Sequence, residues 1–526
     1  NELKGSDTAE FYQAQSDAVR NDSFNWNTTL NEAMDKTGGN ASFVVSAGDQ
    51  IQTTKKKSPG KSEMTSEIEY TGYLSPDVLK SLPVATTVGN HDADNANYTY
   101  HFNTPNSSDL GSNGVVGGDY YFTYGNTLFM MLNTQDTNAA EHKQFMEQAI
   151  AANPNCTWRV VTLHQDIYGS AEHSNEPEIT NLRYTLVPYF EANDVDVVLT
   201  GHDHAYSRTH ILEGGHKTVE YTDDEFDAEL DKDMDAGENP ATRYEAPANI
   251  STDSKEPADV AYLNYLNAVM DKDAIEDTEK GETVVNPDGI LYMTANSSSG
   301  SKYYDLVPRM QSYIANRWQE DVPTYSVIDV TDNTFTINTY RTDNDQKIDE
   351  TFTIKKGVTE DIKSASVGKV KNQIYTGKQI QPALKVTLNG KTLKAGKDYT
   401  VTYTDNKNTG LAKATINGIG KYTGTQTVTF KIVPKKAVLK TVKAGKSGTA
   451  TVTIGKAGGK VSGYAIQVST DSSFKKVTTY RTAKTTYALK NLSKGKTYYV
   501  RVKAFTKVSE KNVYGAASKT IKVKAK

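Results

Sequence analysis

The sequence predicts an α/β domain followed by two small all-β modules. In residues 1–360, helix-like segments alternate with short apolar strands, whereas 364–433 and 434–526 contain only short strands of alternating polarity. A chain of 526 residues is also too long for one hydrophobic core and favours about three domains. We therefore expect one domain boundary between 360 and 364, with a linker near Asp361, and a second boundary between 433 and 434.

Four helix-to-strand units define the first domain. Apolar residues at helical spacing predict a helix over 25–36, before a strand at 41–47. The pattern recurs as SPDVLKSL with PVATTVGN, HKQFMEQAIAAN with WRVVTLH, and LVPYFEAN with VDVVLTGH. The sheet resumes at GILYMTAN and closes with hairpin strands in TYSVIDVTDNTFTINTYRT. Such alternation predicts a sheet covered by helices, with ligands bound on loops at the strand ends.

An acidic segment interrupts this pattern between about 213 and 288. It contains TDDEFDAELDKDMD, and its periodicity predicts a helix only around 258–270. We interpret the segment as an insertion. A lid over a site is one possibility, but solvated loops of this composition are more common, and we expect a solvated loop.

The segment 364–433 predicts a β module. Its strands at 401–403 and 427–432 are bounded by the turn sequences NG, AGKD, DNKN and IGKY. It resembles the Lys- and Gly-rich Ig-like repeats of bacterial surface proteins. We therefore expect a small Ig-like sandwich.

The segment 434–526 predicts a second β module, because GYAIQVSTD, KTTYALKNL and KTYYVRVKAF alternate cleanly. Leu492, Gly495 and Tyr498 resemble the tyrosine-corner region of a fibronectin type III module. In that motif the Tyr hydroxyl ties a strand to the preceding loop. We expect Tyr498 to make this bond.

Composition excludes several classes of function. Hydrophobic residues make up 37% and charged residues 23%, as in soluble proteins, and no apolar run is long enough to span a membrane. The single cysteine, Cys156, excludes internal disulfides and a thiolate-built metal site, and we expect a buried structural thiol. The acidic first half argues against a nucleic-acid channel, which needs a basic lining.

Metal-type ligands follow four of the predicted strands. They are Asp49, then Asn90 with His91 and Asp92, then His164, and finally His202 with His204. Each alone is more often a turn residue or a satisfied polar side chain, but strand ends converge on one edge of a sheet. Carboxylates, imidazoles and an amide oxygen suit borderline metals, and two ions about 3.5–4 Å apart activate water for attack on phosphorus.

The order GD, GNHD, H and GHDH resembles the calcineurin-like metallophosphoesterases. GHDHAYSRT is close to the GHxHAYxR signature of the purple acid phosphatase branch, and HQDIYGSAEHSNE resembles its segment with a second histidine. The resemblance covers about 24–341, apart from the insertion. It implies a four-layer sandwich with helices outside two β-sheets, and hydrolysis of phosphate esters, monoesters rather than diesters, by a metal-activated water.

Residue by residue, the resemblance implies five metal ligands, which are Asp49, Asn90, His164, His202 and His204. Asp49 would bridge two ions, His204 would bind the second ion, and the others would complete the first site. His91 would contact the substrate phosphate. His173 would line the substrate side and assist the leaving group.

The sequence departs from the family pattern in two places. An aspartate-ending strand is expected before Asp49, but Asp7, Asp17 and Asp22 lie in polar contexts typical of a loop or a helix face. We therefore expect the first strand to lie upstream of the polar, loop-like start, and the given chain to bind about one metal with weak or no activity. Gln52 stands where the purple enzymes have the iron-binding Tyr, which argues against a ferric-tyrosinate centre and leaves Fe, Zn and Mn open.

A cell-surface or cell-wall binding protein with a vestigial metal site is the alternative, but the full ligand set for one metal favours the enzyme. Beyond Pro434 the only acids are Asp471 and Glu510 among many lysines. We expect either a surface for an anionic wall polymer, such as a teichoic acid, or lysines that only keep the module soluble. The module arrangement predicts a secreted or surface protein of a Gram-positive bacterium, acting on a small phosphate ester.

Overall fold

A computed structural model divides the chain into two compact units, residues 1–356 and 357–526. The structure describes residues 9–53, 62–235, 244–245, 247–277 and 283–526. Asp361, near which a linker is predicted, lies in strand β16 (Glu360–Asp361), which pairs with β23 (Tyr422–Thr423). The linker near this residue stays a prediction.

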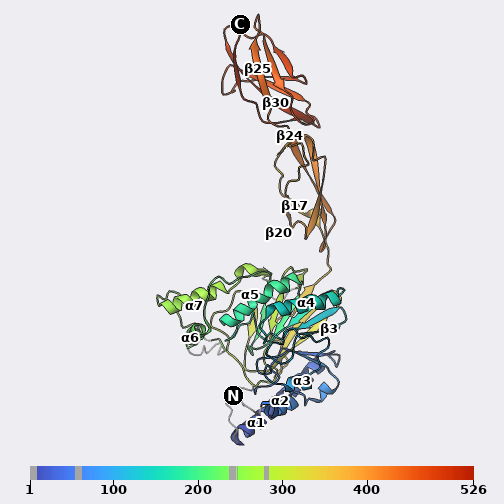
Figure 1. Cartoon of the computed structure of the whole chain (residues 1–526), viewed down its shortest axis with the longest axis vertical. Coiled ribbons are helices and arrows are strands. Elements are labelled where there is room, and N and C mark those ends of the chain that lie inside the picture. Colours follow the sequence, from blue (N-terminus) through green and yellow to red (C-terminus); the bar gives the residue numbers. More distant parts are fainter. Residues whose placement is uncertain (1–8, 54–61, 236–243, 246, 278–282) are drawn as a thin grey trace. The chain divides into compact units, whose positions relative to one another are not determined.

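A seven-stranded sheet forms the centre of the first unit (Figure 1). In spatial order its strands are β12 (Ile314–Trp318), β7 (Tyr206–Thr209), β11 (Leu291–Thr294), β6 (Val197–Thr200), β5 (Trp158–Thr162), β4 (Thr127–Met131) and β3 (Tyr120–Tyr124). Strands β4, β5, β6 and β11 run parallel. Helices α4 (Ala139–Ala152) and α5 (Pro177–Ala192) cover one face, where Phe145 and Phe190 join the core under Met130 and Val161.

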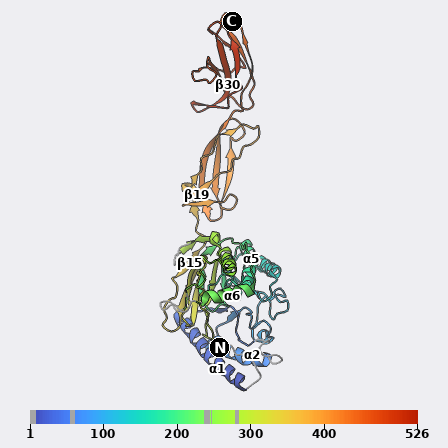
Figure 2. The same ribbon diagram turned by 90° about the vertical axis from the view of Figure 1, so that its left-hand side faces the viewer.

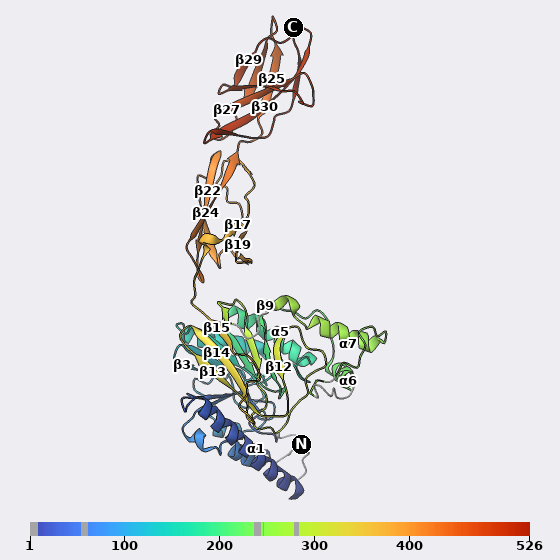
Figure 3. The ribbon, with the colours of Figure 1, turned by 180° about the vertical axis from the view of Figure 1, so that it is seen from behind.

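A second sheet packs on the other face of the first. Its order is β10 (Thr283–Val285), β15 (Phe352–Lys355), β14 (Thr334–Arg341) and β13 (Thr324–Val330), drawn in yellow in Figure 3. Phe129 and Leu199 of the first sheet share one apolar cluster with Phe335 and Ile354 of the second. Helix α1 (Ala9–Lys36) contacts β13 and lies beside α2 (Ser62–Tyr73), as Figure 2 shows. The prediction of two packed sheets with helices outside them is confirmed.

Strands β1 (Val44–Ser46) and β2 (Val84–Thr86) pair in parallel, as a two-stranded sheet. They match the strands predicted before Asp49 and Asn90. Val45 packs against the cluster between the two large sheets, so this pair belongs to the same core. A short helix, α3 (Asn97–His101), follows β2.

Two local predictions in this region are wrong. Helix α1 begins at Ala9 rather than near residue 25, so Asp17 and Asp22 lie on a helix, and Asp7 lies outside the described residues. SPDVLKSL forms only a 3₁₀ turn at Asp77–Lys80, because prolines flank the segment and restrict its backbone. Helix α2 and the β3–β4 hairpin had no predicted counterpart.

The acidic insertion is a packed helical layer rather than the expected solvated loop. Its helices α6 (Asp223–Met234) and α7 (Pro257–Ala268) contribute to one apolar cluster, made of Phe226, Leu230, Ile250, Tyr262, Tyr265, Leu266, Val269 and Val307. The Thr222 side chain accepts the Glu225 backbone N–H, and acids in the first turn suit the helix dipole. Short strands β8 (Ile211–Leu212) and β9 (Ile275–Asp277) close the base of the insertion. Most of the acids therefore lie outside an ordinary core, while the buried Asp233 pairs with Arg309.

A buried ion pair joins His142, on α4, to Asp119, which directly precedes β3. The Nδ1 atom of His142 lies 2.8 Å from Asp119, its Nε2 atom lies 2.8 Å from the Asp136 carbonyl oxygen, and both ionisable side chains are fully buried. Burial lowers the pKa of His142, but the bond to Asp119 and the charge of that carboxylate outweigh it and raise the pKa.

We expect this pair to make the first unit less stable as the pH rises. A histidine whose pKa is raised by folding contributes stability that is complete below its unfolded pKa of about 6.5 and disappears as the pH passes the folded value. The test is urea unfolding of the wild type and of His142→Gln from pH 5.5 to 9. The difference in unfolding free energy should shrink with pH, and a difference that grows would contradict this assignment. His101→Gln is the control, because His101 lies on α3 and pairs with a half-exposed glutamate.

The second unit consists of strands and one 3₁₀ turn at Ile362–Ser364. Its first part has a three-stranded sheet in the order β17 (Ser366–Val367), β19 (Val386–Leu388), β20 (Lys391–Leu393). A four-stranded sheet of the same part has the order β18 (Gln373–Ile374), β24 (Thr425–Val433), β22 (Gly410–Gly418), β21 (Tyr399–Thr404). Its second part has a three-stranded sheet in the order β25 (Val438–Ala444), β26 (Ala450–Gly455), β29 (Thr486–Leu489). A five-stranded sheet of this part has the order β28 (Thr478–Thr482), β27 (Gly463–Ser469), β30 (Thr497–Val508), β31 (Lys511–Tyr514), and β32 (Ile521–Lys524) also pairs with β30. The two all-β sandwich modules are as predicted, and their boundary near residue 434 stays a prediction.

The tyrosine corner is present in the last module. The hydroxyl of Tyr498, at the start of β30, accepts the backbone N–H of Ser493 at 2.9 Å. Leu492 packs into the core of that module. This confirms the predicted tie between the strand and its preceding loop.

Cys156 is only half-buried and packs at the margin of the core around α4 and α5. The expected burial of this thiol is therefore only partial. In the part of the chain that the structure describes, no helix combines the length and apolarity needed to cross a bilayer.

Candidate metal centre

Three strand ends bring a carboxylate and two imidazoles together. Asp49 follows β1, His164 follows β5 and His202 follows β6, and one ligand atom from each lies within 4.8 Å of the others. The His164 Nε2 atom is 3.3 Å from Asp49 Oδ2 and 3.1 Å from His202 Nδ1. The predicted convergence of these three residues is therefore present in the fold.

Asn90 adds an amide oxygen to this cluster, with its Oδ1 atom 2.9 Å from His164 Nε2. Two glycines allow the turns to approach so closely. A Cβ atom on Gly48 would lie 2.4 Å from His164 Nδ1, and one on Gly89 would lie 2.0 Å from Asp49 Oδ1. The Gly-Asp and Gly-Asn sequences are thus required by the packing of the ligand loops.

The hydrogen bonds of the imidazoles decide which nitrogens face the cluster. His164 Nδ1 lies 2.7 Å from the Ala47 carbonyl oxygen, and His204 Nδ1 lies 3.0 Å from that of Lys302. A nitrogen that faces a carbonyl carries its proton, so the Nε2 atom of each ring presents a lone pair. For His164 that lone pair meets the oxygens of Asp49 and Asn90. Such atoms repel one another unless a proton or a cation lies between them, and the donor set fits a borderline metal ion.

Electrostatics keep these groups in the protonation states of metal ligands. Burial and the neighbouring imidazoles lower the pKa of His202 well below its usual value, and burial lowers the pKa of His204 to about 4. Burial raises the pKa of Asp49, but His164 and His91 lower it more, and the net pKa lies below the usual range. The pKa of His164 moves the other way, because burial lowers it but the charge of Asp49 and the hydrogen bond to Asp49 raise it above its usual value. At neutral pH the Asp49 carboxylate therefore pairs with a proton on His164, in the place that a cation would take, beside the neutral imidazoles of His202 and His204.

His91 lies beside the cluster without being one of its ligand atoms. Its backbone N–H donates to Asp49 Oδ1 at 2.9 Å, its ring Nδ1 lies 2.7 Å from the Gln52 carbonyl oxygen, and its Nε2 atom is 4.0 Å from Asp49 Oδ2. Gln52 thus orients His91 through its backbone. This geometry leaves the Nε2 atom facing the space beside Asp49.

Comparison with known proteins identifies the domain that carries this cluster. Residues 21–206 match the family model described as calcineurin-like phosphoesterase. The chain has a calcineurin-like phosphoesterase domain. Residues 439–520 match the fibronectin type III domain, so both resemblances are confirmed, whereas the Ig-like character of 364–433 stays a prediction.

Similar proteins add little to the family assignment. Two uncharacterized proteins, from two strains of Mycobacterium tuberculosis, are 26% identical over 156 residues, which is 25% of this chain and 29% of theirs. The chain thus spans less than a third of the length of these relatives. A purple acid phosphatase from yellow lupin (Lupinus luteus) seeds is similar over 63% of this chain and 49% of its own, with 13% identity and a TM-score of 0.40. The sixth fibronectin type III domain of a human protein matches over 18% of this chain and 85% of its own, with 21% identity and a TM-score of 0.15.

In the phosphoesterase domain, His173 lies against the ligand cluster. Its ring centre is 5.0 Å from that of His202 and 4.8 Å from that of Tyr304, and its Nδ1 atom pairs with Glu176. Burial lowers the pKa of His173, but the hydrogen bond to Glu176 and the charge of Asp203 outweigh burial and raise the pKa to about 9. The side chain is therefore an imidazolium at neutral pH, as a proton donor requires.

Sequence reasoning missed the partners of these histidines. Glu176 was available as the acid three residues after His173, but Tyr304 comes from a distant loop, where its ring centre also lies 5.0 Å from that of His204. Asp92, named in the GNHD motif without a role, is fully buried and accepts the Gly89 N–H and the Tyr70 hydroxyl. Burial and the charge of Asp49 raise the pKa of Asp92 to about 7.

The predicted second metal site is less complete than the first. Among the described residues, the cluster of three acidic or histidine ligands does not include His204. Asp17 and Asp22 lie on α1 and are not members of the cluster either.

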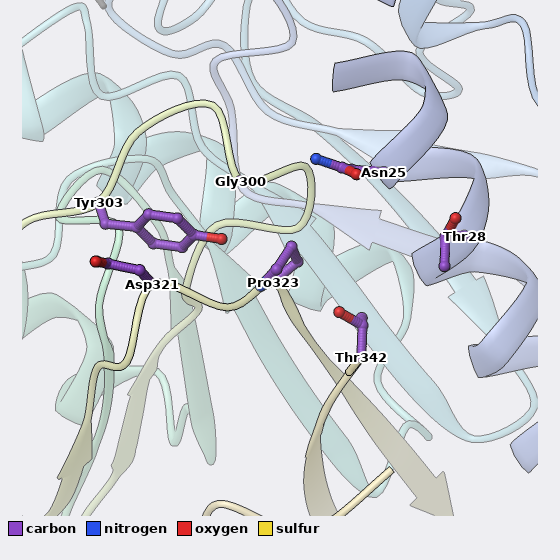
Figure 4. Close-up of a pocket in the computed structure, with 7 residues that line it drawn as sticks. All are labelled: Asn25, Thr28, Gly300, Tyr303, Asp321, Pro323 and Thr342. Carbon is purple, nitrogen blue, oxygen red and sulfur yellow. The ribbon is translucent and has the colours of Figure 1, made fainter. Parts of the chain in front are cut away.

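A pocket of about 230 Å³ lies beside the loop that carries Gly300 and Tyr303 (Figure 4). It is lined by Asn25, Thr28, Gly300, Tyr303, Asp321, Pro323 and Thr342. Tyr303 faces this pocket, whereas its neighbour Tyr304 packs against His173 and His204. The pocket is therefore separate from the ligand cluster, although one loop contributes to both.

Proposed function

We propose that this protein hydrolyses phosphate esters, with phosphomonoesters as its substrates, in the manner of an acid phosphatase. Metal-dependent phosphoester hydrolysis is the activity of the family whose domain it contains. The observation that carries the proposal is the convergence of Asp49, Asn90, His164 and His202 lone pairs on one point. An ionised carboxylate beside the neutral imidazoles of His202 and His204 fits a cation such as Fe, Zn or Mn.

The chain's own residues then divide the work. Asp49, Asn90, His164 and His202 would hold one ion, and Asp49 with His204 would hold a second. Bound metal ions lower the pKa of water and offset the charge of the phosphoryl group.

The two remaining histidines would act on the substrate. His91 would contact the substrate phosphate on its Nε2 side, because its Nδ1 already pairs with the Gln52 carbonyl oxygen. His173, protonated beside Glu176, would give its proton to the leaving oxygen. Gln52 places no phenolate at the metal, so we expect no tyrosinate charge-transfer band.

We expect hydrolysis of 4-nitrophenyl phosphate to disappear after metal is removed with a chelator and to return with added divalent metal. Elemental analysis should find about one tightly bound ion per chain, because among the described residues one candidate site has four donors and the other has two. Bis(4-nitrophenyl) phosphate, a diester, should be the poorer substrate. Turnover that survives complete metal removal would contradict the mechanism, and faster diester hydrolysis would contradict the monoester preference.

A cell-surface binding protein with a vestigial metal site is the second candidate. It is favoured by the small number of donors at the second site, where we place Asp49 and His204. A chain that binds one ion but does not turn over any phosphate ester would support it.

We further propose that the last module holds a secreted enzyme near an anionic polymer of a Gram-positive wall. Its two acids are used locally: Asp471 accepts two backbone N–H groups in its own turn, and Glu510 pairs with Lys507. The other lysines of residues 434–526 therefore leave a net positive surface.

Binding of the full chain to teichoic-acid-containing walls should exceed that of a chain lacking 434–526. It should weaken steeply between about 50 and 500 mM salt, as charge attraction does. Equal binding by both chains, or binding that does not depend on salt, would contradict the proposal.

A further inference from the structure

The turn between the two metal-type histidines of the GHDH motif carries a third polar side chain, that of Asp203, which is fully buried. Its Oδ2 atom accepts the Ala171 backbone N–H at 2.8 Å and the Ser174 hydroxyl at 2.5 Å. Its Oδ1 atom accepts the His173 backbone N–H at 2.9 Å. One carboxylate thus binds three groups of the loop that carries His173.

The backbone of the turn explains this division of side chains. His202 and His204 have left-handed φ angles of 69° and 46°, and the Asp203 N–H donates to the Gly201 carbonyl at 2.8 Å. In this tight turn the two imidazoles reach the ligand cluster and the Tyr304 ring, whereas the carboxylate between them reaches the 171–174 loop. The turn therefore contacts the ligand cluster through His202 and the loop of His173 through Asp203.

The far side of the same loop is fixed separately. Arg183, on α5, donates to the Ser174 carbonyl and to the Asn175 side chain, and the Tyr265 hydroxyl on α7 donates to the Asn175 carbonyl. These bonds hold the end of the loop. The backbone at His173 is held by Asp203, which accepts its N–H, and by the Glu176 N–H, which donates to its carbonyl oxygen at 3.1 Å. The ring of His173 lies 5.0 Å from that of His202, so a small movement of this backbone changes its place over the cluster.

We infer that Asp203 is a positioning residue, which sets the imidazole of His173 at the leaving-group side of the cluster without touching substrate or metal. This inference rests on the proposed function, because it assigns Asp203 to the proton-donating half of the same site. A neighbouring carboxyl, Asp166, offers a matched comparison. It is equally buried, contacts the Ser174 hydroxyl at 2.9 Å and hydrogen-bonds to Asp203 itself, but the Ala171 and His173 N–H groups go to Asp203.

The first test does not need turnover. In full-length Asp203→Asn, metal content should equal that of the wild type, and amide hydrogen exchange in the peptide 167–176 should accelerate about tenfold, since a buried N–H loses its charged acceptor. Asp166→Asn should accelerate exchange there much less. Unchanged exchange in Asp203→Asn, or equal acceleration in both variants, would overturn the inference whether or not the protein proves to be a phosphatase.

The second test compares leaving groups. An alkyl phosphate needs a proton on its leaving oxygen, whereas 4-nitrophenolate leaves readily without one. Asp203→Asn should therefore lower kcat on the alkyl ester by about 10², the size of a general-acid contribution, and by less than tenfold on the aryl ester, with KM little changed.

His173→Gln should also lower kcat more on the alkyl ester than on the aryl ester. The double variant, with Asp203→Asn and His173→Gln, should be no slower than His173→Gln alone, because the effects of residues that act as a unit do not add. Equal losses on both esters, or additive losses in the double variant, would contradict a positioning role. A wild type that hydrolyses neither ester would count against the proposed function instead, and the exchange experiment would still decide whether Asp203 holds the loop.

Discussion

Replacing His202 by alanine should remove the metal from the phosphoesterase domain, whereas replacing His91 should leave the metal bound and slow the reaction. His202 contributes one of the converging lone pairs, 3.1 Å from His164 Nε2, so its loss removes a ligand. His91 keeps its Nδ1 on the Gln52 carbonyl and offers only Nε2 to the substrate side. Losing such an oxyanion contact typically lowers kcat by about 10² to 10³.

The measurement is elemental analysis of both purified variants beside steady-state kinetics at saturating added metal. His101→Ala serves as the control, because it removes an imidazole that pairs with Glu67 on neighbouring helices. Equal metal loss in the His91 and His202 variants would mean that His91 is a ligand. Full metal retention in both would place the ion elsewhere.

The sequence was sufficient to predict the ligand cluster because strand ends converge. His164 and His202 follow the neighbouring strands β5 and β6 of the large sheet, and Asp49 follows β1, an apolar strand of the small sheet that packs on the same core. The surroundings of the cluster obey no such rule. Tyr304 reaches His173 from a loop more than a hundred residues away, and neither its spacing nor its composition marks it.

The wrong expectation for the insertion has a similar physical cause. Phe226 and Leu230 have helical spacing, but the surrounding acids lower the mean hydropathy and hide it. Apart from the buried Asp233, those acids lie in the first turn of α6 or farther from its core, where the helix dipole and solvent favour them. Composition therefore described the surface of this layer and not the core beneath it.

Helix α1 shows the opposite error, in which a helix is longer than its apolar pattern. Only the part near Trp26 and Leu30 has the regular spacing that predicts a helix, and these two residues are buried. The earlier turns contain mostly exposed polar residues, with Phe11 and Gln15 as the buried contacts. Tertiary packing rather than amphipathic periodicity accounts for that extension.

Replacing Gly89 by alanine should disable the metal centre from a residue that has no functional group. A Cβ atom there would lie 2.0 Å from Asp49 Oδ1 and 2.2 Å from the Asp49 backbone nitrogen, so the loop that carries the carboxylate must move. We expect metal affinity to fall by at least 10- to 100-fold, as when the support of a ligand is lost, and unfolding free energy to fall by about 1–3 kcal/mol from overpacking.

Gly368→Ala is the matched control, because its Cβ atom would meet no atom closer than 3.5 Å. Metal titration followed by calorimetry, with urea unfolding of the same samples, separates lost affinity from lost stability. If Gly89→Ala binds metal as tightly as the wild type, Asp49 cannot be a ligand in the position that the structure gives it. A selective loss of affinity would instead show that close approach of the two glycine turns builds the site, and that the Gly-Asn-His-Asp sequence places its glycine for the benefit of a carboxylate forty residues earlier in the chain.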